Sequence, residues 1–152
     1  MEMIIFIGIP GAGKSTFFQE RFANTHVRIN LDMLKTRTRE KILIEACITA
    51  KQPFVVDNTN ITIAERKRYI PLARQAGFLV IGYYFQSDLK TALQRNQQRN
   101  GKAAIPTGGV IARYHQLQLP NFNEGFDRLY YVSIDPSTSQ FSVAEWMNES
   151  GS

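Results

Sequence analysis

The stretch GIPGAGKST, residues 8–16, fits the pattern G-x-x-x-x-G-K-[ST] without a departure. It follows the apolar run MIIFI, residues 3–7, which is typical of a strand buried on both faces. A helical pattern begins directly after it, at Lys14. Glycines allow the backbone to curl until its N–H groups point at an anion, and a helix adds its positive N-terminal end. The sequence therefore predicts a strand, a phosphate-binding loop and a helix, in this order.

The side chains of this loop suit a nucleoside triphosphate with its metal ion. Lys14 is expected to reach the β- and γ-phosphates, and the Ser15 hydroxyl is expected to ligate Mg²⁺. ATP and Mg²⁺ are therefore the predicted cofactors. The residues expected to contact the nucleotide in this loop are Gly11, Ala12, Gly13, Lys14, Ser15 and Thr16.

Outside the loop, apolar runs alternate with helical patterns along the chain. Further strands are expected at residues 27–30, 53–57, 78–85 and 128–134. Helices are expected at residues 14–23, 31–51, 62–77, 88–101, 107–117 and 142–149. Pro71 should kink or divide the third of these helices. This order predicts an α/β fold with a mostly parallel sheet of about five strands and helices on both faces.

Length and composition limit the class of protein. The 152 residues have the size of one domain, which we place at residues 1–150, with residues 151–152 as an added tail. The net charge of +5 and the pI near 9.5 suit an anionic partner such as a nucleotide, a phosphorylated metabolite or a nucleic acid. No run approaches the roughly 18 apolar residues of a membrane helix, and no leader is visible, so no membrane partner is expected. The single cysteine, Cys47, cannot form an internal disulfide, and a cytoplasmic setting is expected.

A bound nucleotide is open to two reactions: water attacks it, or a bound alcohol accepts the γ-phosphate. A kinase needs a carboxylate that takes the proton of the alcohol, and loops at the carboxyl ends of parallel strands supply such groups. Asp32 follows the strand at 27–30, and Asp57 ends the strand at 53–57. Asp32 is a candidate general base, or an aspartate that is merely favourable in a first helical turn. Asp57 is a candidate Mg²⁺ ligand, directly or through water, or a turn residue.

Basic residues gather in the region expected to form a lid, at about residues 88–118. Arg95 and Arg99 lie on one face of the expected helix, at a spacing of about one turn. This helix runs into the irregular segment 100–126, which is rich in Gly, Pro and Asn and typical of a lid or binding loop. A lid arginine can accelerate phosphoryl transfer by about 10³–10⁵. The two arginines are therefore candidates for this role, and a solvated basic face is the alternative.

Five segments, in this order, resemble the 5′-hydroxyl polynucleotide kinase domain of nucleic-acid repair enzymes, one of the small P-loop kinases. The resemblance covers nearly the whole chain, and the ordered set is far more specific than the phosphate loop alone. The segments are GIPGAGKST (8–16), INLDMLK (29–35), VVDNTN (55–60), RNQQRNGKAAIP (95–106) and LPNFNEGFDRLYYV (119–132). They are similar to the phosphate loop, the asparagine–any–aspartate segment, the D-T-N segment, the lid with two arginines and the closing segment with its E-G-F triplet.

The resemblance implies a P-loop kinase-like fold with a helical lid and a role for each candidate. It implies that Asp32 is the general base, that Arg99 stabilises the transferring group and that Arg95 binds the nucleotide. In that family an arginine three residues after the aspartate grips nucleic-acid phosphate. Lys35 stands there in this chain, with Arg37 two residues further on. A lysine is a point charge without bidentate geometry.

Lys35 and Arg37 are accordingly assigned to the phosphate of the acceptor. The implied acceptor is a 5′-hydroxyl end of RNA or DNA. Two alternatives stay open: a kinase of a small-molecule alcohol, and an ATP-binding or ATPase module without transfer activity.

Overall fold

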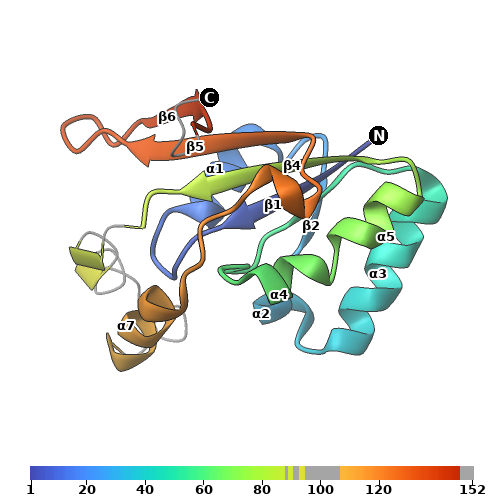
Figure 1. The fold of residues 1–152 in the computed structure, drawn as a ribbon, viewed down its shortest axis with the longest axis horizontal. Coiled ribbons are helices and arrows are strands. Elements are labelled where there is room, and N and C mark those ends of the chain that lie inside the picture. Colours follow the sequence, from blue (N-terminus) through green and yellow to red (C-terminus); the bar gives the residue numbers. More distant parts are fainter. Residues whose placement is uncertain (88, 91–92, 95–106, 148–152) are drawn as a thin grey trace.

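The structure is a computed structural model, and it describes residues 1–87, 89–90, 93–94 and 107–147. Six strands form one sheet in the order β2-β3-β1-β4-β5-β6 (Figure 1). The strands are β1 (Glu2–Ile7), β2 (Val27–Ile29), β3 (Phe54–Val56), β4 (Leu79–Phe85), β5 (Arg128–Ile134) and β6 (Phe141–Glu145). Strands β1 to β5 pair in parallel, and β6 runs antiparallel to β5. The predicted α/β class with a mostly parallel sheet is therefore confirmed.

Helices connect the strands, and two of the expected helices are divided. The helices are α1 (Lys14–Arg21), α2 (Leu31–Leu34), α3 (Arg37–Ala50), α4 (Ile63–Lys67), α5 (Ile70–Gln75) and α7 (Thr107–Gln116), with a 3-10 turn η2 at Phe122–Glu124. The pattern at 31–51 breaks between α2 and α3 because Lys35 has a φ of 74°, which a right-handed helix cannot contain. The pattern at 62–77 divides near Pro71, as predicted. The helix expected at 88–101 lies largely outside the described residues.

The core lies on both faces of the sheet, and alternate residues of β1 point into each half. Ile5 packs in the cluster that Ile44 of α3 and Ala73 of α5 complete, whereas Phe6 packs in the cluster of Phe17 of α1. The rings of Phe6 and Phe17 meet edge to face, with centroids 5.8 Å apart. Because both faces of β1 are covered, its sequence is apolar without alternation. None of the helices in the described part of the chain is long and apolar enough to cross a bilayer.

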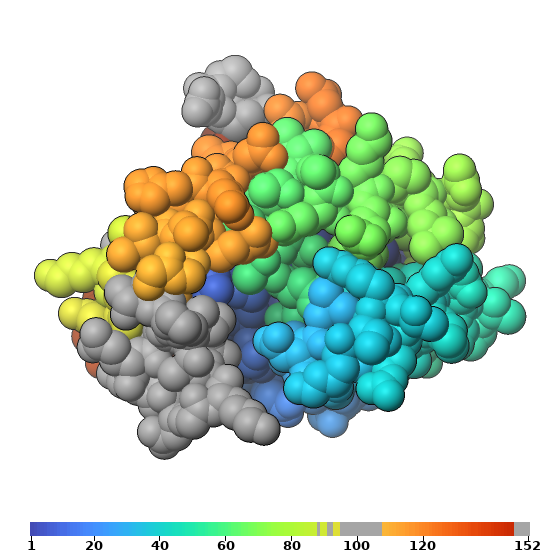
Figure 2. Space-filling model, turned by 90° about the horizontal axis from the view of Figure 1, so that it is seen from below, coloured from blue at the N-terminus to red at the C-terminus, as the bar shows by residue number. Residues whose placement is uncertain are grey.

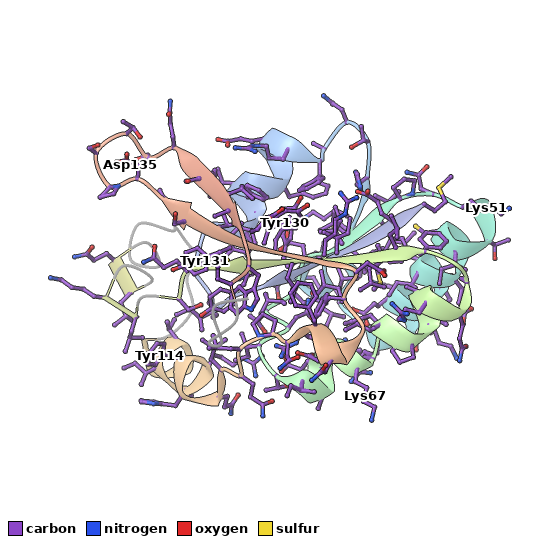
Figure 3. All side chains as sticks on the ribbon, turned by 45° about the horizontal axis from the view of Figure 1, so that its top comes forward. Lys51, Lys67, Tyr114, Tyr130, Tyr131 and Asp135 are labelled. Atoms are coloured by element: carbon purple, nitrogen blue, oxygen red, sulfur yellow. The ribbon has the colours of Figure 1, made fainter. Side chains whose placement is uncertain are left out.

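The prediction of a terminal helix at 142–149 is wrong, because this segment enters strand β6. The chain reverses after β5 at Asp135, whose Oδ1 accepts a hydrogen bond from the backbone two residues on, at 2.8 Å (Figure 3). Phe141 then packs edge to face on Phe17 of α1, and Trp146 packs on aromatic rings of β4 and β5. These aromatic residues belong to the two opposite core clusters. A strand directs side chains to both faces of the sheet, so this segment packs on both clusters. A helix with one apolar stripe could pack on only one of them.

The tyrosines of β5 follow the same two-faced arrangement (Figure 3). Tyr130 stacks on Tyr83 of β4 with ring centroids 5.1 Å apart, on the face covered by α1. Tyr131 points to the other face and lies 6.3 Å from the ring of Trp146. Strand β5 is therefore an inner strand, flanked by β4 and β6 and packed on both faces.

Gly82→Ala is expected to destabilise the fold by about 1–3 kcal/mol, because the added methyl overpacks the core. Gly82 lies inside β4, and a Cβ there would meet Leu129 Cδ2 at 2.6 Å and Phe126 Cε1 at 2.8 Å. Urea unfolding measures the change. The matched control is Gly108→Ala in α7, where a Cβ meets no described atom within 4 Å. Alanine should stabilise that helix by about 0.5–1 kcal/mol, and equal effects at the two sites would contradict the packing described for β4.

Candidate active site

The phosphate loop connects β1 to α1 at the carboxyl end of a central strand (Figure 1). Gly11 and Gly13 have φ values of 86° and 98°, a region that side chains disfavour. Lys14 turns back over the loop, and its Nζ donates to the carbonyl oxygens of Gly8 at 2.8 Å and Ile9 at 3.0 Å. Gly13 is also the N-cap of α1, so the positive end of this helix faces the loop. The predicted strand, loop and helix are therefore confirmed.

The other predicted nucleotide contacts in the loop differ in exposure. Ala12 is buried in the cluster that contains Phe17 of α1, so its side chain anchors the loop to the core. Ser15 and Thr16 are exposed in the first turn of α1. Both residues therefore lie at the N-terminal end of α1, where a bound phosphate is predicted.

Asp32 lies in the first turn of α2, directly after β2, and its side chain is exposed. Two asparagines hold this short helix against the loop after β3. Asn30 caps α2 by accepting a backbone hydrogen bond at 2.9 Å, and its Nδ2 donates to the carbonyl oxygen of Asp57 at 2.6 Å. Asn58 Oδ1 accepts from the first backbone N–H of α2 at 2.9 Å. These contacts fix the backbone of α2, so Asp32 is held at the same end of the sheet as the phosphate loop.

Asp57 and Ser15, the two predicted metal ligands, meet around a third side chain. The Asp57 side chain is only 2% exposed, and its Oδ2 accepts from Arg28 Nε at 2.8 Å. Arg28 Nη2 donates to Ser15 Oγ at 3.1 Å. Sequence reasoning missed Arg28, whose only signal is a charge inside the short strand β2. One guanidinium therefore contacts both predicted ligands, and their metal-binding role stays a prediction.

The chemistry of this pair fits Mg²⁺. Ser15 and Asp57 supply hard oxygen donors, and Mg²⁺ is usually bound through one or two carboxylates together with phosphate oxygens and waters. In the described ranges, no group of three or more His, Cys, Asp or Glu side chains gathers into a metal cage. A donor set of this size suits a magnesium ion that arrives with a triphosphate.

Arg37, assigned from the sequence to the acceptor, has partners inside the protein. Its Nη1 donates to Glu40 Oε1 at 2.8 Å and to Tyr69 Oη at 2.9 Å. Tyr69 Oη in turn donates to the other oxygen of the buried Glu40 at 3.0 Å. Burial, followed by the charge of Glu40, raises the pKa of Tyr69 and keeps it a donor. This network ties α3 to the junction of α4 and α5, and the Arg37 side chain stays 49% exposed.

Helix α7, the second part of the expected lid, is anchored beside the phosphate loop. Arg113 Nη2 donates to Thr59 Oγ1 at 2.6 Å and to Glu65 Oε1 at 2.7 Å. Val110 of α7 is fully buried in a small cluster that includes Ile9 of the phosphate loop. Seen from below, the surface is hollowed between α7 and the pair α2–α3, with N-terminal residues at its floor (Figure 2). The loops after β1, β2 and β3 thus share one recess.

Three predicted residues have no described contact in this recess. Arg95 and Arg99, expected to act from the lid, lie outside the described residues. Lys35 is exposed at the C-cap of α2, one turn after Asp32. Their assigned roles stay predictions.

Comparison with known proteins agrees with this geometry. The chain matches the AAA domain family over residues 3–120. It is 30% identical over 136 residues to the bifunctional polynucleotide phosphatase/kinase of Schizosaccharomyces pombe, and the alignment covers 86% of this chain and 33% of that protein. The chain therefore spans about a third of the length of that relative.

A second relative and a solved structure share the same framework. The L-seryl-tRNA(Sec) kinase of Methanococcus maripaludis is 24% identical over 166 residues, which cover 97% of this chain and 64% of that protein. Kti12 of Chaetomium thermophilum, solved in complex with ADP-AlF3, superposes with a TM-score of 0.63 at 17% identity, over 90% of this chain and 93% of that one. The chain thus belongs to the AAA domain family and has a P-loop kinase fold, and its predicted resemblance to polynucleotide kinases is confirmed.

Proposed function

We propose that this domain transfers the γ-phosphate of ATP, in the presence of Mg²⁺, to the 5′-hydroxyl end of RNA or DNA. The observation that carries the proposal is the position of Asp32, exposed on α2 at the sheet end where the phosphate loop lies. A carboxylate in this position can take the proton of a hydroxyl that attacks the γ-phosphate. The likeness to a bifunctional polynucleotide phosphatase/kinase supports a nucleic-acid acceptor.

In this mechanism the 5′-hydroxyl oxygen attacks the γ-phosphorus, and the bond to the leaving oxygen of ADP breaks. The hydroxyl proton passes to the carboxylate of Asp32. Lys14 and the loop amides hold the β- and γ-phosphates, while Arg99 stabilises the moving group and Arg95 binds the nucleotide. Ser15 and Asp57 would hold Mg²⁺, which neutralises charge on the phosphate oxygens.

The acceptor's phosphate is assigned to the basic residues that follow Asp32. Lys35 is exposed one turn away, at the C-cap of α2. Arg37 begins α3, and although Nη1 is bound to Glu40 and Tyr69, half of the side chain remains exposed. The two cations thus follow Asp32 along the chain, at the end of α2 and at the start of α3. A strand whose 5′ end reaches Asp32 would pass its first phosphates along them.

A second candidate is a kinase of a different alcohol. The similarity to an L-seryl-tRNA(Sec) kinase, which covers 97% of this chain, favours it. Such an enzyme would use the same phosphate loop and the same base, and only the acceptor contacts would differ. Acceptor identity, and not the transfer chemistry, separates the two candidates.

A labelling screen separates them. ATP labelled at the γ-phosphate is offered with a 5′-hydroxyl oligonucleotide, a nucleoside, a phosphorylated sugar and a serine-charged tRNA, each in its own reaction. We expect label on the 5′ end of the oligonucleotide. Label on the serine-charged tRNA or on a small alcohol alone would favour the second candidate. ATP hydrolysis with no labelled acceptor would indicate a module without transfer activity.

The affinity for a single-stranded 5′-hydroxyl oligonucleotide should fall about sevenfold between 50 and 200 mM salt. This follows from two phosphate contacts, at Lys35 and Arg37, each adding about −0.7 to the slope of log affinity against log salt. Fluorescence anisotropy measures the slope. Lys35→Gln should halve it, and the control Lys51→Gln, at the far end of α3, should leave it unchanged (Figure 3). Salt-insensitive binding would contradict the nucleic-acid acceptor.

A further inference from the structure

Arg28 occupies the position between the two groups that fit a metal ion. Its Nε lies 2.8 Å from Asp57 Oδ2, and its Nη2 lies 3.1 Å from Ser15 Oγ. Its guanidinium carbon also lies 5.9 Å from the centroid of the Phe18 ring. One guanidinium thus bridges the end of β3 and the first turn of α1.

This bridge satisfies a physical requirement. The Asp57 side chain is 2% exposed, and a buried carboxylate needs a cation or several hydrogen-bond donors. Arg28 supplies the cation, and its Nε–H donates to Asp57 Oδ2. The same contacts engage the oxygen atoms that a metal ion would use: one carboxylate oxygen of Asp57 and the hydroxyl oxygen of Ser15. Arg28 and a divalent cation also repel each other at this distance.

We propose that Arg28 is an internal counter-ion that occupies the metal position until a nucleotide arrives with Mg²⁺, which then displaces it. This inference rests on the Mg²⁺ site of the proposed function and adds a regulation of that site. Before displacement the guanidinium neutralises Asp57 and keeps free divalent cations from binding. The guanidinium and Mg²⁺ compete for Asp57 and Ser15. The added negative charge of the triphosphate favours Mg²⁺ in this competition, so the metal and the nucleotide bind together.

The position of Arg28 in the fold allows this exchange. In the sheet that the described residues form, strand β2 lies at the edge and pairs only with β3. The Arg28 side chain is 26% exposed, so it reaches solvent by rotating about its own bonds while the backbone of β2 stays paired. The backbone of Asp57 is held in place, because its N–H donates to the carbonyl oxygen of Ile29 and its own carbonyl oxygen accepts from Asn30 Nδ2. The moving part is therefore one side chain.

Mn²⁺ binding without nucleotide tests the proposal. Electron paramagnetic resonance counts free Mn²⁺ as it is titrated into the wild-type protein, into Arg28→Gln and into the control Arg21→Gln. The control removes the same charge from the exposed end of α1. We expect Arg28→Gln to bind Mn²⁺ about tenfold or more tightly than the wild type and the control. Asp57→Asn added to Arg28→Gln should abolish the gain. Equal affinities in all variants would overturn the proposal.

A second measurement uses the wild-type protein and does not depend on whether Arg28→Gln folds. A crystal structure with Mg²⁺ and a non-hydrolysable ATP analogue should show Arg28 Nε beyond hydrogen-bond distance of Asp57, and the metal on the Ser15 hydroxyl. An intact Arg28–Asp57 pair beside a bound metal would overturn the proposal. Neither measurement uses an acceptor or a transfer step. A failure of the proposed function, seen as an unlabelled oligonucleotide, is therefore distinguishable from a failure of this inference.

Discussion

Asp32→Asn is expected to lower the rate of phosphate transfer to a 5′-hydroxyl oligonucleotide by about 10²–10⁴-fold, which is the contribution of a positioned general base. An amide has the size of the carboxylate and cannot accept the hydroxyl proton. Helix α2 should keep its place, because Asn30 and Asn58 hold it through backbone contacts that do not involve the Asp32 side chain. Single-turnover kinetics with saturating ATP measure the loss.

Nucleotide binding provides the control for this variant. The phosphates are held by Lys14, Ser15 and the loop amides, on a different element from Asp32. Isothermal titration should therefore find nearly unchanged affinity for ATP with Mg²⁺ in Asp32→Asn, and a strongly reduced affinity in Lys14→Ala. Transfer by Asp32→Asn at the wild-type rate would remove Asp32 from the mechanism.

Arg66→Met is expected to reduce the free energy of unfolding by about 3–5 kcal/mol, the usual effect of removing one partner from a buried ion pair. Arg66 is 0% exposed, and its guanidinium binds both carboxylate oxygens of Glu124, at 2.7 and 3.0 Å. Its Nη1 also donates to the carbonyl oxygen of Asn60 at 2.9 Å. Methionine fills much of the space, but the nearly buried Glu124 carboxylate loses its counter-ion and keeps the backbone N–H of Asn121 as its donor. The carbonyl oxygen of Asn60 loses the Arg66 donor.

Urea unfolding of two further variants separates the ion pair from side-chain packing. The control Arg68→Met makes the same chemical change at an exposed position two residues on and should shift stability by less than about 0.5 kcal/mol. Arg66→Met combined with Glu124→Leu should recover part of the loss, because no charge then stays buried alone. A single Arg66→Met variant as stable as Arg68→Met would contradict the ion-pair account.

The sequence predicted those parts of the fold that depend on local patterns. The apolar run of β1 is visible as an uninterrupted stretch of core side chains. The glycines of the phosphate loop and Pro71 restrict the backbone within a few residues. All three can therefore be read from short stretches of sequence. Strand β6 could not be inferred in this way. Its short segment suits a helix or a strand, and pairing with β5 and aromatic packing on both faces decided between them.

The site shows the same division between local and tertiary information. Asp32 and Asp57 were found because each follows a predicted strand, and such strand ends meet at one edge of a parallel sheet. Arg28 and Arg113 were missed as site residues because their partners lie 29 and 54 residues away in sequence. Arg37 is assigned to the acceptor from the sequence. Its shared contact with Glu40 and Tyr69 depends on the packing of α3 against the α4–α5 junction, which the sequence does not show.

Transfer to two oligonucleotides that differ only at the 5′ terminus shows whether a 5′-hydroxyl oxygen accepts the phosphate. One carries a 5′-hydroxyl, and the other carries a 5′-deoxy terminus that keeps every phosphate but lacks the attacking oxygen. With γ-labelled ATP, Mg²⁺ and the wild-type protein, we expect label on the first oligonucleotide and none on the second, although both bind and compete equally. Label on both, or on neither while another alcohol is labelled, would contradict transfer to a 5′-hydroxyl end.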